Sequence, residues 1–141
     1  MALNLVKLAV GIEDVDQLAA RQARWRNVRG NTRHRTRMMP TRGAEICPGG
    51  SMYWVIRGMI QVRQPIVALH RKTDKDAKSY CVIELAMQHV VVEPVARRPF
   101  QGWRYLRDED APRDMGEVGT AYIDPKMPKA LRLELRRLGL L

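Results

Sequence analysis

The stretch that decides the fold reads Ser51-Met-Tyr-Trp-Val-Ile-Arg57 and follows the glycine turn Gly49-Gly50. Aromatic and β-branched residues dominate it, as is typical of strands. Three more segments with strand composition follow, Met59–Arg63, Ile66–Arg71 and Tyr80–Val95. The polar residues 72–79 separate the last two and predict a hairpin loop. The middle of the chain is therefore predicted to be an antiparallel sheet.

The flanking segments add a helix and shorter strands. Residues 3–10 have the composition of a strand, which ends at Gly11. Asp14 suits a helix N-cap, with Gln17 as its capping-box partner, so we expect a helix over residues 15–26. Two further segments are predicted to be short and extended: residues 35–39, which stop at Pro40, and residues 100–106, as a final strand or an ordered loop.

The C-terminal quarter reads differently from the middle of the chain. Residues 108–127 are acidic at their start and contain proline and glycine, so we expect an irregular segment. Residues 128–139 predict a short amphipathic helix, because Leu131, Leu135 and Leu138 share one helical face. The whole chain, residues 1–141, is then a single α+β domain: a small antiparallel pseudo-barrel with one N-terminal helix and a short C-terminal helix.

Composition limits the classes of function. The 141 residues are 45% hydrophobic and carry a formal net charge of +10, which fits a globular basic protein. The two cysteines and three histidines show no metal-ligand spacing, and no phosphate-binding glycine loop precedes a helix, so we expect neither a metal nor a cofactor. The N-terminus is too short and polar for a signal peptide, and no stretch is apolar enough to span a bilayer. We expect a cytoplasmic protein that does not contact membranes.

Arginine is the most informative residue type. From Arg21 to Arg42 the chain has eight arginines and no acidic residue, and 19 of its 25 basic residues are arginine. The guanidinium group binds phosphate through two parallel hydrogen bonds and stacks on bases, which an ammonium group does not do. The run therefore indicates a surface for a polyanion, although a solvated basic face has the same composition.

Aromatic residues are interleaved with these bases. Six of the eight aromatics lie in or near two basic strand segments, a combination typical of proteins that bind single-stranded nucleic acid. Alternation along the strand places Tyr53 and Trp54 on opposite faces, so at least one of the two rings should be buried, and Trp54 is the one we expect in the core. We expect RNA, single-stranded or structured, as the partner, with the ribosome or tRNA among the candidates and no catalysis. The expected binding surface, in which Tyr53 or Trp103 could stack on a base, comprises Arg33, Arg35, Arg37, Arg42, Tyr53, Arg57, Arg63, Gln64, Arg97, Arg98, Trp103 and Arg104.

Two other functions fit the same sequence. The first is a small hydrolase or nucleotide-modifying enzyme, with a pocket lined by Tyr53, Arg57, Gln64 and Trp103. It would need a buried glutamate or lysine in that pocket, and Glu84 and Glu93 are the candidates in the predicted strands. The second is a module that binds an acidic protein.

Several segments carry a resemblance to known families. Thr36–Arg42, Gly49–Gly58, Arg98–Leu106 and the Leu-Gly-Leu-Leu ending resemble a family of small uncharacterised bacterial proteins known only as a domain of unknown function. This resemblance covers nearly the whole chain and implies no activity. A weaker one concerns Gly50–Pro94, which resembles the core of PUA-like folds of the ASCH and EVE type. It implies a small pseudo-barrel of a kind that often binds RNA or modified bases and in some relatives has a catalytic pocket.

Overall fold

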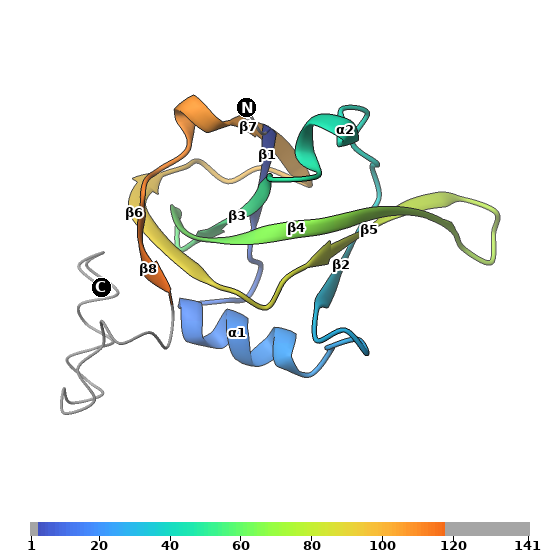
Figure 1. Ribbon diagram of the computed structural model, residues 1–141, viewed down its shortest axis with the longest axis horizontal. Helices are drawn as coiled ribbons and strands as arrows, with labels where there is room; N and C mark the ends of the chain where they lie inside the picture. The colour runs from blue at the N-terminus through green and yellow to red at the C-terminus, as the bar shows by residue number, and fades with distance from the viewer. Residues whose placement is uncertain (1–2, 118–141) are drawn as a thin grey trace.

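The computed structural model describes residues 3–117, and it consists mainly of strands (Figure 1). These residues contain two short α-helices, α1 (Val15–Ala23) and α2 (Gly43–Ile46), together with a 3-10 turn at Asp108–Asp110. The same residues form eight strands: β1 (Leu3–Leu8), β2 (Thr32–Thr36), β3 (Ser51–Ile56), β4 (Met59–Thr73), β5 (Ser79–Leu85), β6 (Val90–Ala96), β7 (Trp103–Arg107) and β8 (Asp114–Glu117).

These strands form one open sheet of mixed direction. Its order is β2-β5-β4-β3-β1-β7, and β6 lies between β4 and β8. The predicted antiparallel pseudo-barrel is wrong on two counts. Strand β1 runs parallel to β3, and no backbone pairing among residues 3–117 joins β2 to β7. A parallel neighbour needs a crossover connection of a dozen or more residues, and residues 9–50, which contain α1, β2 and α2, form this connection.

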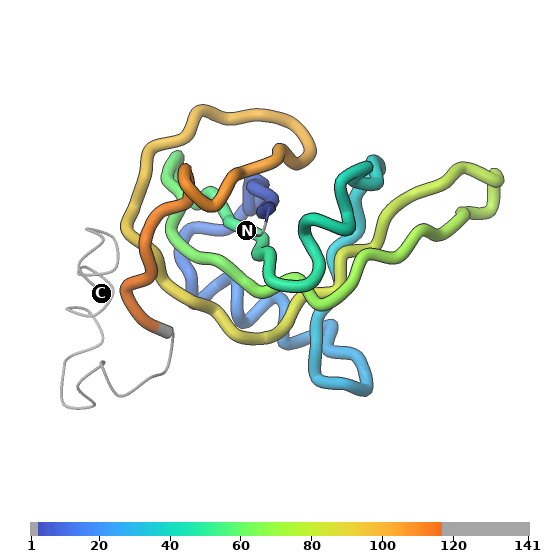
Figure 2. Tube along the Cα trace, turned by 45° about the horizontal axis from the view of Figure 1, so that its top comes forward, coloured from blue at the N-terminus to red at the C-terminus, as the bar shows by residue number. Residues whose placement is uncertain are grey.

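Strand β4 holds the sheet together because it pairs with three strands. Its first half pairs with β3 and β6, and its second half pairs with β5. The change of partner occurs next to Pro65, which has no N–H to donate. The β4–β5 hairpin extends beyond the rest of the molecule (Figure 2).

Both faces of the central strands β1 and β3 are buried. Trp54 packs in one core with Leu5 and Ile83, while Tyr53 packs in the other with Val6. Tyr53 and Trp54 are 6% and 3% exposed. The expected burial of Trp54 is therefore observed, and Tyr53 is buried as well.

Helix α1 begins as the sequence predicts. The Asp14 carboxylate accepts a hydrogen bond from the Gln17 N–H at 2.8 Å, and the Gln17 side chain accepts one from the Glu13 N–H. The helix ends at Ala23 rather than Arg26, and it buries Val15, Leu18 and Gln22. It lies below the sheet in the view of Figure 1.

Three other segments differ from or fall outside the expectations. Strand β2 covers Thr32–Thr36 rather than the expected residues 35–39, and the two threonines at its ends are buried. Within the segment expected to be irregular, residues 114–117 form β8, which pairs with β6. The helix expected over residues 128–139 lies outside the described residues.

Candidate nucleic-acid interface

Strand β2 separates its side chains into two sets. Thr32 and Thr36 face the core, whereas Arg33 and Arg35 are exposed on the opposite side. The antiparallel register with β5 places Arg33 opposite Glu84, so successive outward residues of β2, β5 and β4 share one surface. The Thr-Arg-His-Arg-Thr sequence thus directs two guanidiniums away from the core.

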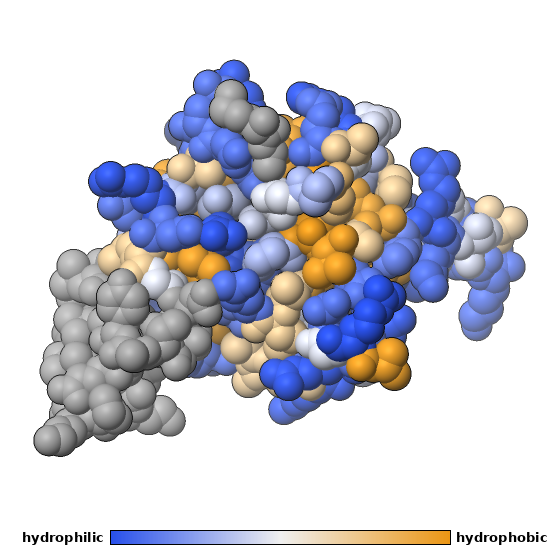
Figure 3. Space-filling view, in the orientation of Figure 1, coloured by the Kyte–Doolittle hydropathy of each residue, from blue (hydrophilic) through white to orange (hydrophobic). Residues whose placement is uncertain are grey.

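This surface gathers basic side chains from four segments, and we call it the basic face. Register and ion pairs bring these residues together, and the hairpin end of the molecule is mostly hydrophilic (Figure 3). The basic face comprises Arg29, Arg33, Arg35, Arg37, His70 and Lys72.

Arg35 is held in place by an aromatic ring. Its guanidinium carbon lies 3.9 Å from the centre of the Tyr80 ring. A guanidinium stacked in this way keeps N–H groups at its edge, where an anion can accept hydrogen bonds. Because Tyr80 already orders the Arg35 side chain, Arg35 loses less conformational entropy when it binds an anion.

Glu84 is a buried carboxylate beneath the basic face. It is 1% exposed and accepts hydrogen bonds from Asn31 at 2.8 Å and Asn27 at 3.3 Å, while His70 Nε2 lies at 3.1 Å. The bonds from Asn31 and His70, with smaller effects of Asn27 and Arg29, lower the pKa of Glu84 to about 2. The carboxylate thus anchors the loop between α1 and β2, and it is not poised as a general acid.

Two of the expected phosphate-binding arginines have acidic neighbours. Arg37 lies 3.7 Å from Asp74, and Arg42 makes a bidentate pair with Glu45 at 2.6 and 2.7 Å. Arg42 is also near the Tyr105 ring. Its guanidinium is therefore more fully occupied than those of Arg33 and Arg35.

The remaining expected arginines do not join the basic face. Arg97 and Arg104 both lie over the Phe100 ring, at 5.5 and 5.4 Å, and the N–H of Arg97 bonds to Gly58, next to Arg57. Arg98 is exposed in the same connection between β6 and β7. The single surface expected from the sequence is thus at least two separate clusters.

The expected stacking residue Trp103 has a local partner. Its Nε1–H donates to the Met38 carbonyl at 2.8 Å, and its ring packs edge-on against Tyr105. The Tyr105 hydroxyl in turn accepts from the Arg42 N–H at 3.2 Å. These contacts hold β7 against the segment after β2, so Trp103 has a structural role there.

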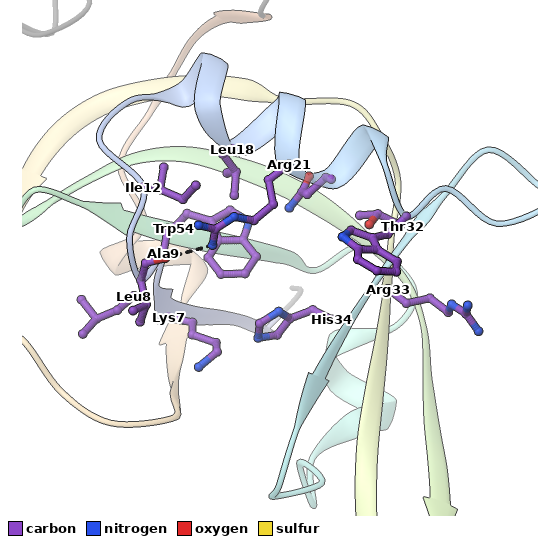
Figure 4. A pocket seen from close by; sticks show the side chains of 13 residues that line it. Lys7, Leu8, Ala9, Ile12, Leu18, Arg21, Thr32, Arg33, His34 and Trp54 are labelled. Carbon is purple, nitrogen blue, oxygen red and sulfur yellow. Dashed lines mark hydrogen bonds between the residues drawn. The ribbon is translucent and has the colours of Figure 1, made fainter.

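A cavity of about 270 Å³ lies between α1, the end of β1 and the inner side of β2 (Figure 4). We call it the α1 pocket. Arg21 and His34 point toward Trp54 in this pocket, Lys7 lies at its edge with its nitrogen directed away from Trp54, and Arg33 points away from the pocket. Among the described residues no carboxylate lines the pocket, so the charged side chains of its otherwise largely apolar and aromatic lining are all cationic.

A network of buried side chains fixes Trp54. Its indole N–H donates to Gln64 Oε1 at 2.8 Å, and Gln64 exchanges two hydrogen bonds with Gln22. His89 Nε2 also lies 2.7 Å from Gln22 Oε1. Gln64 is fully buried, so it supports the pocket from behind and is not part of a binding surface.

A second, more open cavity contains Arg63, and we call it the Arg63 cleft. Asp114 binds the Arg63 guanidinium through two hydrogen bonds of 2.7 Å, and Ser51 Oγ accepts a third at 3.0 Å. Buried Asn4 donates to Asp108 and accepts from the Ser51 N–H. The cleft therefore neutralises its cation with a carboxylate.

These positions separate the residues expected to form a catalytic pocket. Tyr53 lines the Arg63 cleft, Gln64 is buried behind Trp54, and Trp103 lies on β7. Of the two candidate acids, Glu84 is engaged below the basic face, and Glu93 lies 3.6 Å from Arg113. Within residues 3–117 no cluster of His, Cys, Asp and Glu could hold a metal ion.

The family model for proteins described as "Protein of unknown function (DUF1489)" matches residues 5–141. The chain belongs to this family. Membership confirms the resemblance to an uncharacterised family and brings no activity with it. No curated protein and no solved structure matches the chain, so the resemblance to PUA-like folds is not supported. Across the part of the chain that the structure describes, no helix is long and apolar enough to span a membrane.

Sequence reasoning does not identify the residues of the α1 pocket. It places Lys7 within a strand and His34 among the bases of the arginine run. The signal available is the alternation in Thr32–Thr36, which places His34 with the inward threonines. Its contact with Trp54 brings together residues 20 positions apart, and no local pattern predicts that.

Proposed function

We propose that this chain binds RNA through the basic face, without catalysis. The observation that supports the proposal is the outward side of β2, where Arg33 and Arg35 are exposed and Arg35 is stacked on Tyr80. The carboxylate that lies opposite Arg33 is Glu84, which is buried and already engaged by its neighbours. Both guanidiniums are thus available to an external anion.

Their spacing suits a chain of phosphates. Residues two apart on a strand are about 7 Å apart, so each guanidinium can bind a different phosphate of one extended strand. Arg29 and Lys72 widen the positive surface on either side. A cytoplasmic location, where RNA is an abundant polyanion, belongs to the same proposal.

The test is a pair of double charge reversals in a binding titration. Arg33→Glu/Arg35→Glu changes the basic face, and Arg57→Glu/Arg98→Glu is the matched control in the other cluster. Both lower the formal net charge from +10 by four units. Affinity for a short fluorescent single-stranded RNA is measured over a salt series, with duplex RNA and DNA alongside.

We expect the first pair to weaken binding at least tenfold and the control to weaken it less than threefold. The slope of log K against log salt should become shallower by about 1.4 in the first pair, at about 0.7 for each phosphate that the variant no longer neutralises. Equal weakening in both pairs would show that net charge alone attracts RNA and would contradict the proposal. So would absence of binding at low salt, and an acidic protein partner would then replace RNA as the hypothesis.

A further inference from the structure

The α1 pocket has uncompensated cations. Lys7 has no hydrogen-bond or ion-pair partner among residues 3–117, and burial lowers the pKa of its ammonium group. Arg21 donates to the Val10 carbonyl at 3.0 Å and has no carboxylate partner within the described residues. Lys7 is half-buried, and leaving its charge unpaired costs free energy that an anionic ligand would recover, whereas Arg21 adds an exposed positive charge beside it.

The pocket also offers one unsatisfied polar atom. His34 Nε2 is buried and has no hydrogen-bond partner within the described chain, and its ring meets Trp54 edge-on at 5.2 Å. Burial and the nearby Lys7 charge lower the pKa of His34 to about 4, so the ring is neutral at pH 7. A neutral imidazole can donate or accept one hydrogen bond at this nitrogen, depending on its tautomer.

The rim of the pocket is apolar and exposed. Trp25 and Val10 both line the pocket, and they are 68% and 75% exposed. An indole left in solvent beside a cavity provides a flat surface on which a planar ring can stack. The rim therefore favours an aromatic ligand over a simple anion.

We infer that the α1 pocket binds a nucleoside monophosphate, with its base against Trp25, its phosphate near Lys7 and Arg21, and a polar group paired with His34. A cavity of about 270 Å³ lies just below the usual range for ligand sites, about 300–1,000 Å³, so it suits at most one nucleotide and excludes a dinucleotide cofactor. The nucleotide can be free or can be the 5′-phosphorylated end of an RNA strand. The inference does not depend on the basic face, since Arg35 is not among the residues that line the pocket, and the side chain of Arg33, which does line it, points away from it.

The first experiment is isothermal titration calorimetry with AMP, UMP, adenosine and inorganic phosphate. We expect saturable 1:1 binding of AMP or UMP, with adenosine and phosphate at least tenfold weaker. Lys7→Met and Trp25→Ala should each weaken nucleotide binding about tenfold, because each removes one half of the recognition. Their matched controls, Arg63→Met and Val28→Ala, should not change it.

The outcomes separate this inference from the proposed function. No binding of AMP or UMP at millimolar concentration would overturn it, and so would phosphate binding as tightly as AMP, or a Lys7→Met variant with unchanged affinity. None of these results bears on the basic face, because Arg35→Glu/Arg37→Glu, which changes that face and no residue that lines the pocket, is expected to retain nucleotide binding.

A competition experiment distinguishes the two sources of the nucleotide. Short RNAs with a 5′-phosphate or a 5′-hydroxyl are added to the AMP complex of the Arg35→Glu/Arg37→Glu variant. Displacement by the phosphorylated RNA alone assigns the pocket to a strand end, and displacement by neither RNA assigns it to the free nucleotide. Both results support the inference, whereas equal displacement by both RNAs contradicts phosphate recognition.

Discussion

The α1 pocket and the Arg63 cleft are built in a similar way, but they differ in whether a carboxylate neutralises the cation inside. Each is supported by a buried carboxamide, Gln64 behind the pocket and Asn4 in the cleft. In the cleft, Asp114 binds the Arg63 guanidinium on two sides. In the pocket, Lys7 has no such partner among the residues described.

The difference separates cations that stabilise the fold from cations that cost it stability. Arg63 connects β4 to Asp114 at the start of β8, so its charge is used within the protein. Lys7 is partly desolvated without compensation, an arrangement that is common where a ligand supplies the missing charge. The same distinction separates Arg42, paired with Glu45, from Arg33 and Arg35 on the basic face.

The largest effect is expected from the amide behind the pocket. Gln64→Leu removes the acceptor of the Trp54 indole and both bonds to Gln22, so it should lower the free energy of unfolding by about 3 kcal/mol. Urea denaturation measures this change. Gln61→Leu, on the same strand with one bond to the Ile56 carbonyl, should cost under about 1 kcal/mol. Equal effects would mean that the hydrogen-bond network behind the pocket contributes no more to the free energy of unfolding than the single bond of Gln61.

A smaller effect is expected from the acid below the basic face. Glu84→Gln keeps the shape of the side chain but removes its charge, which should cost about 2 kcal/mol at pH 7. The pKa of Glu84 is lower in the folded chain than in the unfolded chain, so its contribution is fully present above pH 4.5 and declines as the pH falls toward 2.

Stability measured at several pH values checks the sign of this effect. The difference between the wild type and Glu84→Gln should shrink as the pH falls from 4.5 toward 2. A difference that grows as the pH falls below 4.5 would contradict the assignment of a depressed pKa.

The sharpest comparison replaces one cation in each cavity by the same apolar residue. Arg63→Met should lower the free energy of unfolding by about 1 kcal/mol, because it leaves Asp114 without its partner. Lys7→Met should raise it by about 0.5 kcal/mol, because it removes a partly desolvated charge and keeps the apolar stem. Thermal melting of the two variants measures both changes, and shifts of the same sign would remove the distinction between the cavities.

Local patterns predict much of the chain's secondary structure but not its topology. The α1 cap, the β3 strand and the buried Trp54 follow from residues within a few positions of one another. The parallel pairing of β1 with β3 depends on how a crossover of 42 residues packs, and composition does not encode that.

The sequence predicts that outward arginines form the candidate site, but it does not predict which of the arginines belong to it. Alternation in the arginine run identifies Arg33 and Arg35 as outward, whereas the pairing of Arg63 with Asp114 joins positions 51 apart. Counting arginines therefore overestimates the surface, because charge that is neutralised by a distant carboxylate looks the same in the sequence as charge that is free.

The alternation in β2 makes its register unusually costly to change. A slip of one position against β5 would place Arg33 and Arg35 in the core and expose Thr32, His34 and Thr36. Burying two guanidiniums would therefore raise the free energy of a mispaired state during folding and disfavour it. The side chains proposed to bind RNA would thus also help to select the correct register between β2 and β5.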